Sequence, residues 1–199
     1  NYSQEMIDHF GIKSNSLIVD IGSNDGTCLS FFQDNGMRVL GVDPAIKIAK
    51  KANDQGIETV GDFFSYNLAL ALRKKYGPAK YITSHNACAH IDNLLDIVKG
   101  VKYWLDEDGV FVLEVGYLVD VYNNTWFDTI YHEHHYYYSL YSISKLMKRH
   151  SLEIFDVDKL AIHGGSYRIY VKKIDSDRKI TNRFKKLYSY EGMIGLNSK

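Results

Sequence analysis

Side chains that exchange protons near neutral pH are concentrated in one short segment of this 199-residue sequence. Tyr131 is followed directly by His132, Glu133 and His134, so a phenol, two imidazoles and a carboxylate occupy four consecutive positions. Such groups serve acid–base chemistry in enzymes. We therefore predict that this segment carries out proton transfer in a catalytic site.

Each of these side chains suggests a role. His134 is the predicted general base, because an unperturbed imidazole titrates near pH ~6.5. Glu133 would orient or charge-stabilise a histidine, and Tyr131 would hydrogen-bond to a developing oxyanion. This set suits the removal of a proton beside a ketone, after which the carbon attacks a methyl group. An oxygen nucleophile would need only the base, so these residues favour carbon methylation without requiring it.

The elements that must position this segment alternate along the chain. Strands are predicted at 17–21, 39–42, 57–60, 81–83, 110–115, 152–157 and 166–172, and helices at 27–35, after Pro44, at 67–76, 94–105 and 139–150. This alternation predicts an α/β, Rossmann-like fold with a seven-stranded, mostly parallel sheet and helices on both faces. We expect one domain over 1–173, followed by a polar linker or docking helix over 174–199.

The loop after the first strand indicates which cofactor is bound. Its glycines let the backbone approach a ligand, and Asp43, 21 positions after Gly22, ends the second strand where an acid binds ribose hydroxyls. An NAD site would use the same acid, but the loop is not GxGxxG, and Asp20 and Asp25 would repel a pyrophosphate. S-adenosylmethionine has an ammonium and a sulfonium but no phosphate. The loop therefore predicts S-adenosylmethionine, with an ordinary strand-to-helix turn as the alternative.

Two further groups of residues complete the predicted site. The cofactor is assigned to Asp20, Gly22, Ser23, Asn24, Gly26, Asp43, Pro44, Asp62, Phe63 and Asn86. Asp62 is expected near the adenine amine and Phe63 against its ring, although Phe63 and Phe64 suit a core equally well. The substrate is assigned to His90, His132, Tyr137 and His163. Asn86 and His90 follow the fourth strand, so we expect them in the crevice at the carboxyl end of the sheet.

Structural roles are the alternatives for several of these residues. Residues 132–135 are rich in metal ligands, but the spacing is not HExxH and neighbours in an extended chain point to opposite faces. We therefore predict no metal. His90 also suits the flank of a helix, His163 a turn, and the tyrosines at 136–138 a cavity wall. The lysine pairs at 172–173 and 185–186 are expected to be solvated.

Composition excludes several classes of function. Lysine plus arginine and aspartate plus glutamate both number 24, so no basic surface indicates a nucleic-acid or membrane partner. Cys28 and Cys88 make neither a disulfide framework nor a zinc pattern, which suits a reduced, cytoplasmic setting. No apolar run is long enough to cross a bilayer.

The sequence resembles the S-adenosylmethionine-dependent sugar C-methyltransferases of deoxysugar biosynthesis. The segments that carry the resemblance are 19–27, 41–44, 109–115, 127–134 and 163–166, and the whole match runs from 17 to 172. The YHEH sequence ending at His134 is its most specific part. The resemblance implies a class I methyltransferase fold and a nucleotide-linked 4-keto-deoxysugar as substrate, methylated on the carbon beside the ketone. His134 would be the base, with Glu133 and Tyr131 supporting it.

Members of that family usually carry an amino-terminal zinc module and a carboxyl-terminal α/β domain that help to hold the nucleotide sugar. Neither is found in this sequence, and two cysteines cannot form a four-cysteine zinc site. We expect either the central domain of a longer protein or a minimal relative. The alternatives to a C-methyltransferase are a non-catalytic module that binds S-adenosylmethionine and an O- or N-methyltransferase of a small metabolite.

Overall fold

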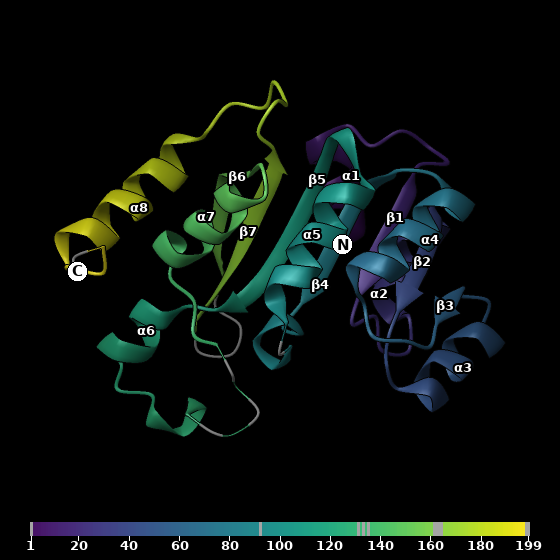
Figure 1. Cartoon of the computed structure of the whole chain (residues 1–199), viewed down its shortest axis with the longest axis horizontal. Coiled ribbons are helices and arrows are strands. Elements are labelled where there is room, and N and C mark those ends of the chain that lie inside the picture. Colours follow the sequence, from purple (N-terminus) through teal and green to yellow (C-terminus); the bar gives the residue numbers. More distant parts are fainter. Residues whose placement is uncertain are drawn as a thin grey trace.

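A computed structural model of the chain describes residues 2–91, 93–130, 132, 134, 136–160 and 165–197. One twisted sheet runs through the molecule, with helices on both faces (Figure 1). The strands are β1 (Leu17–Ile21), β2 (Arg38–Val42), β3 (Thr59–Val60), β4 (Ala79–His85), β5 (Leu105–Gly116), β6 (Leu152–Leu160) and β7 (Ser166–Lys173). The helices are α1 (Tyr2–Phe10), α2 (Thr27–Asp34), α3 (Ile46–Asp54), α4 (Tyr66–Tyr76), α5 (Leu94–Trp104), α6 (Leu118–Asn123), α7 (Leu140–Arg149) and α8 (Asn182–Met193), with short 3-10 helices η1 (Cys88–His90) and η2 (Phe127–Thr129).

The strand order is β3-β2-β1-β4-β5-β7-β6. Strands β1 to β5 pair in parallel, whereas β7 is antiparallel to both β5 and β6. Parallel neighbours need long crossover connections, which the intervening helices supply. The predicted seven-stranded, mostly parallel sheet is confirmed.

Both faces of the central strands are covered. All five residues of β1 are buried, as expected for a parallel strand with helices on either side. Ile18 and Tyr81 pack with α1 and α2 on one face. Val19 and Ile82 pack with α4, α5 and α7 on the other. The carboxyl edge of the sheet, where the loops gather, is left for the functional residues.

Helix α1 is an element that the sequence prediction missed. It buries Met6, Ile7 and Phe10 and leaves Glu5 and Asp8 exposed, so it is amphipathic. Apolar residues separated by three or four positions were the available signal. The helix packs against α2 and brings Tyr2 over the sheet.

The expectation that the lysine pair at the end of β7 is solvated is wrong. Lys172 and Lys173 are 5% and 4% exposed. The ammonium of Lys172 lies 3.4 Å from the carboxylate of Glu153, and that of Lys173 donates to Glu107 at 2.6 Å. The long side chains are buried while their charges are paired. The other pair, Lys185 and Lys186, is exposed as expected.

Residues 174–197 include helix α8, which packs on the sheet through Phe184. Glu191 of α8 is fully buried, and its two oxygens accept hydrogen bonds from the backbone amides of Leu140 (2.7 Å) and Tyr141 (2.8 Å). These amides belong to the first turn of α7, where helix donors lack internal partners. The division at residue 173 stays a prediction. Over the described part of the chain, no helix is both long and apolar enough to span a bilayer.

Candidate active site

The loop between β1 and α2 contains two glycines whose backbone dihedral angles lie in the left-handed region. Gly22 has φ 79° and Gly26 has φ 80°, values that side chains other than glycine rarely adopt. A Cβ on Gly22 would lie 2.7 Å from the Cβ of Ala87, and one on Gly26 would lie 2.8 Å from Ile57. The loop therefore lies against the segment that follows β4.

Asp43, at the end of β2, holds this loop in place. One carboxylate oxygen accepts the backbone N–H of Asn24 at 2.9 Å, and the other accepts that of Ala45 at 2.9 Å. A carboxylate oxygen has two lone pairs, so each retains acceptor capacity. Ribose binding by Asp43 stays a prediction, and Pro44 beside it is exposed.

Two polar atoms of the loop region are buried without a partner among the described residues. They are Oδ1 of Asp20, whose residue is 3% exposed, and Oγ of Ser23, whose residue is 4% exposed. Burial raises the pKa of Asp20 to about 6, while the charge of His85 lowers it and that of Asp43 raises it further. Buried polar groups in native proteins normally have partners. These atoms therefore mark a place for a ligand with a positive, hydrogen-bonding group.

The two phenylalanines of the predicted adenine site after β3 differ in exposure. Phe63 is 75% exposed, and the backbone N–H of Phe63 donates to the carboxylate of Asp62 at 2.7 Å. Phe64 is buried and stacks on Trp104 with ring centroids 6.2 Å apart. Of the two phenylalanines, only Phe63 presents a face to a ligand, and its contact with adenine stays a prediction.

A cavity of about 370 Å³ opens at the carboxyl end of the sheet. Its lining comes from the ends of β4 and β5, from α6, η1 and η2, and from the start of β7: Asn86, His90, Val115, Gly116, Val121, Trp126, Asp128, Thr129, His134, Tyr136, Tyr137, Tyr138, Gly165 and Ser166. The carboxyl end of an open α/β sheet is where such folds bind ligands. Segments far apart in sequence therefore form one site.

His134 is fixed in this cavity by the carbonyl of Thr129. Nδ1 of His134 lies 2.9 Å from that oxygen, and the hydroxyl of Tyr137 donates to the same oxygen at 3.0 Å. A carbonyl only accepts, so Nδ1 carries a hydrogen, and the basic nitrogen of the neutral ring is Nε2. The arrangement prepares His134 to accept a proton.

Two other predicted residues reach the same cavity. The ring of His90 lies 5.0 Å from that of His134, centroid to centroid. Asn86 is half-buried, has φ 54°, and its backbone N–H donates to the carbonyl of Glu114 at 2.9 Å. Residues 22–26, between β1 and α2, are the loop predicted to bind the methyl donor, and we call them the donor loop. Because Asn86 lines the cavity and the next residue, Ala87, contacts Gly22, Asn86 lies between the donor loop and the cavity.

The remaining predicted residues are His132 and Tyr137, which the structure describes, and three that it does not. Tyr131, Glu133 and His163 lie outside the described residues. His132 is exposed and does not line the cavity, so its assignment to the substrate stays a prediction. The tyrosines at 136–138 line the cavity, and the assignment of Tyr137 to the substrate stays a prediction. Thr129 was missed, although it lies only two positions before Tyr131 in the segment that the sequence singled out.

The chain matches a known protein family over most of its length. The profile described as "Methyltransferase domain" matches residues 4–157. The C-methyltransferase NovU of Streptomyces niveus is 36% identical over 174 residues, which is 87% of this chain. The chain spans 41% of the length of that curated relative.

Solved structures share the fold at much lower identity. Magnesium protoporphyrin IX methyltransferase from Synechocystis PCC 6803, solved with bound SAH, matches with TM-score 0.63 and 13% identity over 85% of this chain and 82% of its own. The plantazolicin methyltransferase BpumL, also solved with SAH, matches with TM-score 0.64 and 10% identity over 86% of this chain and 82% of its own. These likenesses concern the fold alone.

Proposed function

Because the chain belongs to the methyltransferase domain family, we propose that it is a C-methyltransferase of a nucleotide-linked 4-keto-deoxysugar. Its fold is the Rossmann-like class I methyltransferase fold, and its methyl donor is S-adenosylmethionine. A relative named as a C-methyltransferase supports carbon as the atom methylated. The resemblance of the segment ending at His134 supports the keto-sugar.

The residues around the donor loop fit this cofactor. Oδ1 of Asp20 and Oγ of Ser23 are buried acceptors without partners among the described residues, which suits the donor's ammonium. Gly22 keeps the backbone open to close approach, and Asp43 retains acceptor capacity for hydroxyls. When bound, S-adenosylmethionine supplies a methyl group activated by a sulfonium.

One observation carries the proposal for the chemistry. The hydrogen bond from Nδ1 of His134 to the carbonyl of Thr129 leaves Nε2 as the base in a cavity that adjoins the donor loop through Asn86. His134 would remove the proton from the carbon beside the ketone, and that carbon would then form the new bond to the methyl group as the bond from sulfur to the methyl group breaks, which leaves S-adenosylhomocysteine. The proton would stay on the imidazole until it passes to solvent.

The cavity suits the sugar better than the nucleotide. Its volume of about 370 Å³ lies near the lower end of the range of roughly 300–1,000 Å³ that is usual for ligand sites. Aromatic side chains form much of its wall, and none of its described lining residues is lysine or arginine. We therefore infer that the uncharged keto-sugar ring enters the cavity and that the diphosphate lies outside it.

The test uses a nucleoside diphosphate 4-keto-6-deoxyhexose in deuterated water. With S-adenosylmethionine we expect a product whose added methyl group is bonded to carbon, which the NMR chemical shift of that methyl group distinguishes from a methyl group on oxygen or nitrogen. With S-adenosylhomocysteine in place of the donor we expect deuterium to enter the carbon beside the ketone. A methyl group attached to oxygen or nitrogen would contradict the proposal.

His134→Asn is the matched variant. We expect both the deuterium exchange and the methylation to fall by about 10²–10⁴-fold, which is typical when a general base is lost. The dissociation constant for S-adenosylmethionine should not change, because His134 lines the cavity proposed for the sugar and Asn86 lies between that cavity and the donor loop. Unchanged exchange would remove His134 from the mechanism. Donor binding without turnover on any keto-sugar would instead support a non-catalytic module.

A further inference from the structure

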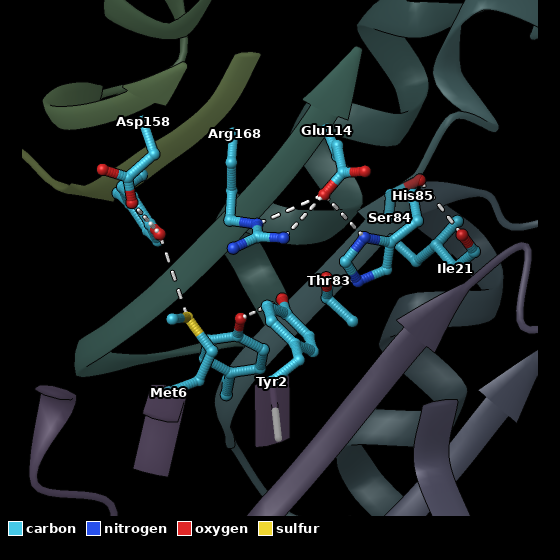
Figure 2. Close-up of polar contacts among 11 residues, drawn as sticks. Tyr2, Met6, Ile21, Thr83, Ser84, His85, Glu114, Asp158 and Arg168 are labelled. Atoms are coloured by element: carbon cyan, nitrogen blue, oxygen red, sulfur yellow. Dashed lines mark hydrogen bonds and ion pairs between the residues drawn. The ribbon is translucent and has the colours of Figure 1, made fainter. Parts of the chain in front are cut away.

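Three polar side chains form a row across the sheet beside the donor loop. His85 of β4 pairs with Glu114 of β5, and Glu114 pairs with Arg168 of β7. Residues in register on neighbouring strands point to the same face. Figure 2 shows the three side chains converging on the face that also carries Tyr2. We call His85, Glu114 and Arg168 the polar row.

One carboxylate oxygen joins the row. Oε2 of Glu114 lies 3.1 Å from Nη2 and 3.2 Å from Nε of Arg168, and 3.3 Å from Nδ1 of His85 (Figure 2). The other ring nitrogen of His85 lies 2.9 Å from the hydroxyl of Thr83. Burial alone would raise the pKa of Glu114, but the hydrogen bond from His85 and the charge of Arg168 outweigh it and lower that pKa. Glu114 is therefore an anion at neutral pH.

Tyr2 of α1 covers the row. The guanidinium of Arg168 lies 4.4 Å from the centroid of the Tyr2 ring, and the ring of His85 meets it edge to face at 5.2 Å. The hydroxyl of Tyr2 lies 2.7 Å from that of Tyr81. Tyr2 thus shields part of the row from water, and the side chain of Glu114 at its centre is 6% exposed, which strengthens the charge interactions of that carboxylate.

The row supplies one of three contacts that hold the end of β4. Ser84 donates to the carbonyl of Ile21 at 3.0 Å, which ties β4 to the end of β1. His85 contacts Glu114, and the next residue, Asn86, donates its backbone N–H to the carbonyl of the same glutamate. Three consecutive residues are therefore anchored where the donor loop meets the cavity.

We propose that His85, Glu114 and Arg168 are positioning residues for the methyl donor, which fix the end of β4 and the charge around Asp20. They act on donor binding, whereas His134 acts on the sugar. The inference rests on the proposed function only for the presence of a donor site beside Asp20. It assigns no contact between the row and the reacting atoms.

The titratable groups that surround Asp20 set the sign of the expected pH effect. Asp43 from the end of β2 and His85 from β4 act on Asp20 directly, in opposite directions. Burial raises the pKa of Cys28 in α2 to about 12, and the charges of Asp20 and Glu114 act in the same direction, whereas that of Arg168 lowers it. The thiol of Cys28 is therefore uncharged. From α1, Tyr2 is also neutral, because burial raises its pKa. The Coulombic effect of His85 lowers the pKa of Asp20, so replacing His85 with a side chain that cannot be charged should raise the pKa of Asp20.

The experiment is a titration of the whole chain with S-adenosylmethionine between pH 5 and pH 8, with no sugar present. For the wild type we expect affinity to fall as Asp20 takes up a proton near pH 6. His85→Asn keeps a donor near the position of Nδ1 but cannot be charged. We expect it to weaken donor binding about tenfold at pH 7 and to move the midpoint of the pH profile upward. Glu114→Gln, which preserves shape, should weaken binding to a similar extent.

Arg183→Gln is the matched control. Arg183 donates to Asp156 through Nε at 3.0 Å, in an arginine–carboxylate pair that joins α8 to β6 and lies outside the donor site. It should lower the melting temperature without changing the donor affinity or the pH midpoint. If His85→Asn and Glu114→Gln lower only the melting temperature, the row is merely structural and the inference is wrong. Because no sugar is present, a failure of the keto-sugar proposal would not affect this result.

Discussion

Burial of the Asp20 carboxylate destabilises the folded protein, although the same carboxylate is expected to bind the methyl donor. Its folded pKa of about 6 lies above the ordinary value of 3.8 because burial disfavours the charged form. The folded state therefore binds more protons than the unfolded state between about pH 4 and pH 6, and stability falls as the pH rises through that window. Above about pH 6 the loss of stability caused by ionising the buried Asp20 carboxylate has reached its full size.

Asp20→Asn should consequently stabilise the donor-free protein at pH 7 while removing donor binding. The shift from 3.8 to about 6 corresponds to about 3 kcal/mol at most. Urea denaturation at pH 7 and at pH 3.5 measures this, and the gain should be present only at the higher pH. Equal gains at both pH values would mean that the charge of Asp20 is not the cause.

Gly22 gives a second prediction, because the chain contains its own control. Gly22 and Gly11 both have positive φ, but a Cβ on Gly22 would collide with Ala87, whereas one on Gly11 would meet nothing within 4 Å. Gly11→Ala should cost about 1 kcal/mol from backbone strain alone. Gly22→Ala should cost about 3 kcal/mol and weaken donor binding at least about tenfold, because the loop must move away from Ala87. Thermal melts and donor titration separate the two effects, and equal losses would contradict the role of the contact.

The sequence predicted which residues gather at the site, because the order of strands and loops along the chain determines which residues lie at the carboxyl end of the sheet. Asn86 and His90 come from one segment and His134 and Tyr137 from another, and both segments line one cavity because they lie at the carboxyl end of the sheet. The carbonyl of Thr129, which fixes His134, has no sequence signal, since every residue has such a carbonyl. Roles of individual side chains toward bound ligands stay predictions.

At the scale of elements, local pattern determined most boundaries and tertiary contact determined the rest. The strand at 17–21 and the start of the helix at Thr27 agree with prediction, because an apolar run ends at glycines. The strand predicted at 57–60 is only Thr59–Val60, and β5 begins earlier than expected, at Leu105. Burial of Lys172 was not predictable, because its partner Glu153 lies on the neighbouring strand.

Helix α8 allows a prediction about how elements hold one another. Glu191→Ala would leave two amides of α7, one buried and one half-buried, without their acceptors, so we expect a loss of about 2–4 kcal/mol in the free energy of unfolding. Lys186→Ala on the exposed side of the same helix should cost less than about 0.5 kcal/mol. Chemical denaturation of both variants provides the measurement. Similar stability of the two variants would show that α8 does not support α7.

At the scale of the whole molecule, donor binding should appear as stability. A ligand at 100 times its dissociation constant stabilises the folded state by about 2.7 kcal/mol. S-adenosylmethionine should therefore raise the melting temperature of the wild type, whereas NAD, whose pyrophosphate would meet Asp20 and Asp25, should not. Differential scanning fluorimetry at pH 7.5 tests both. A shift with NAD alone would contradict the charge argument for the loop.

The joint between α8 and α7 also has a kinetic consequence. The amide hydrogens of Leu140 and Tyr141 are bonded to a side chain from a different helix rather than to their own. Their exchange with deuterated solvent requires the departure of Glu191, even while α7 itself stays wound. These two amides, which lie just after the tyrosine wall of the cavity, therefore report how often α8 detaches from α7.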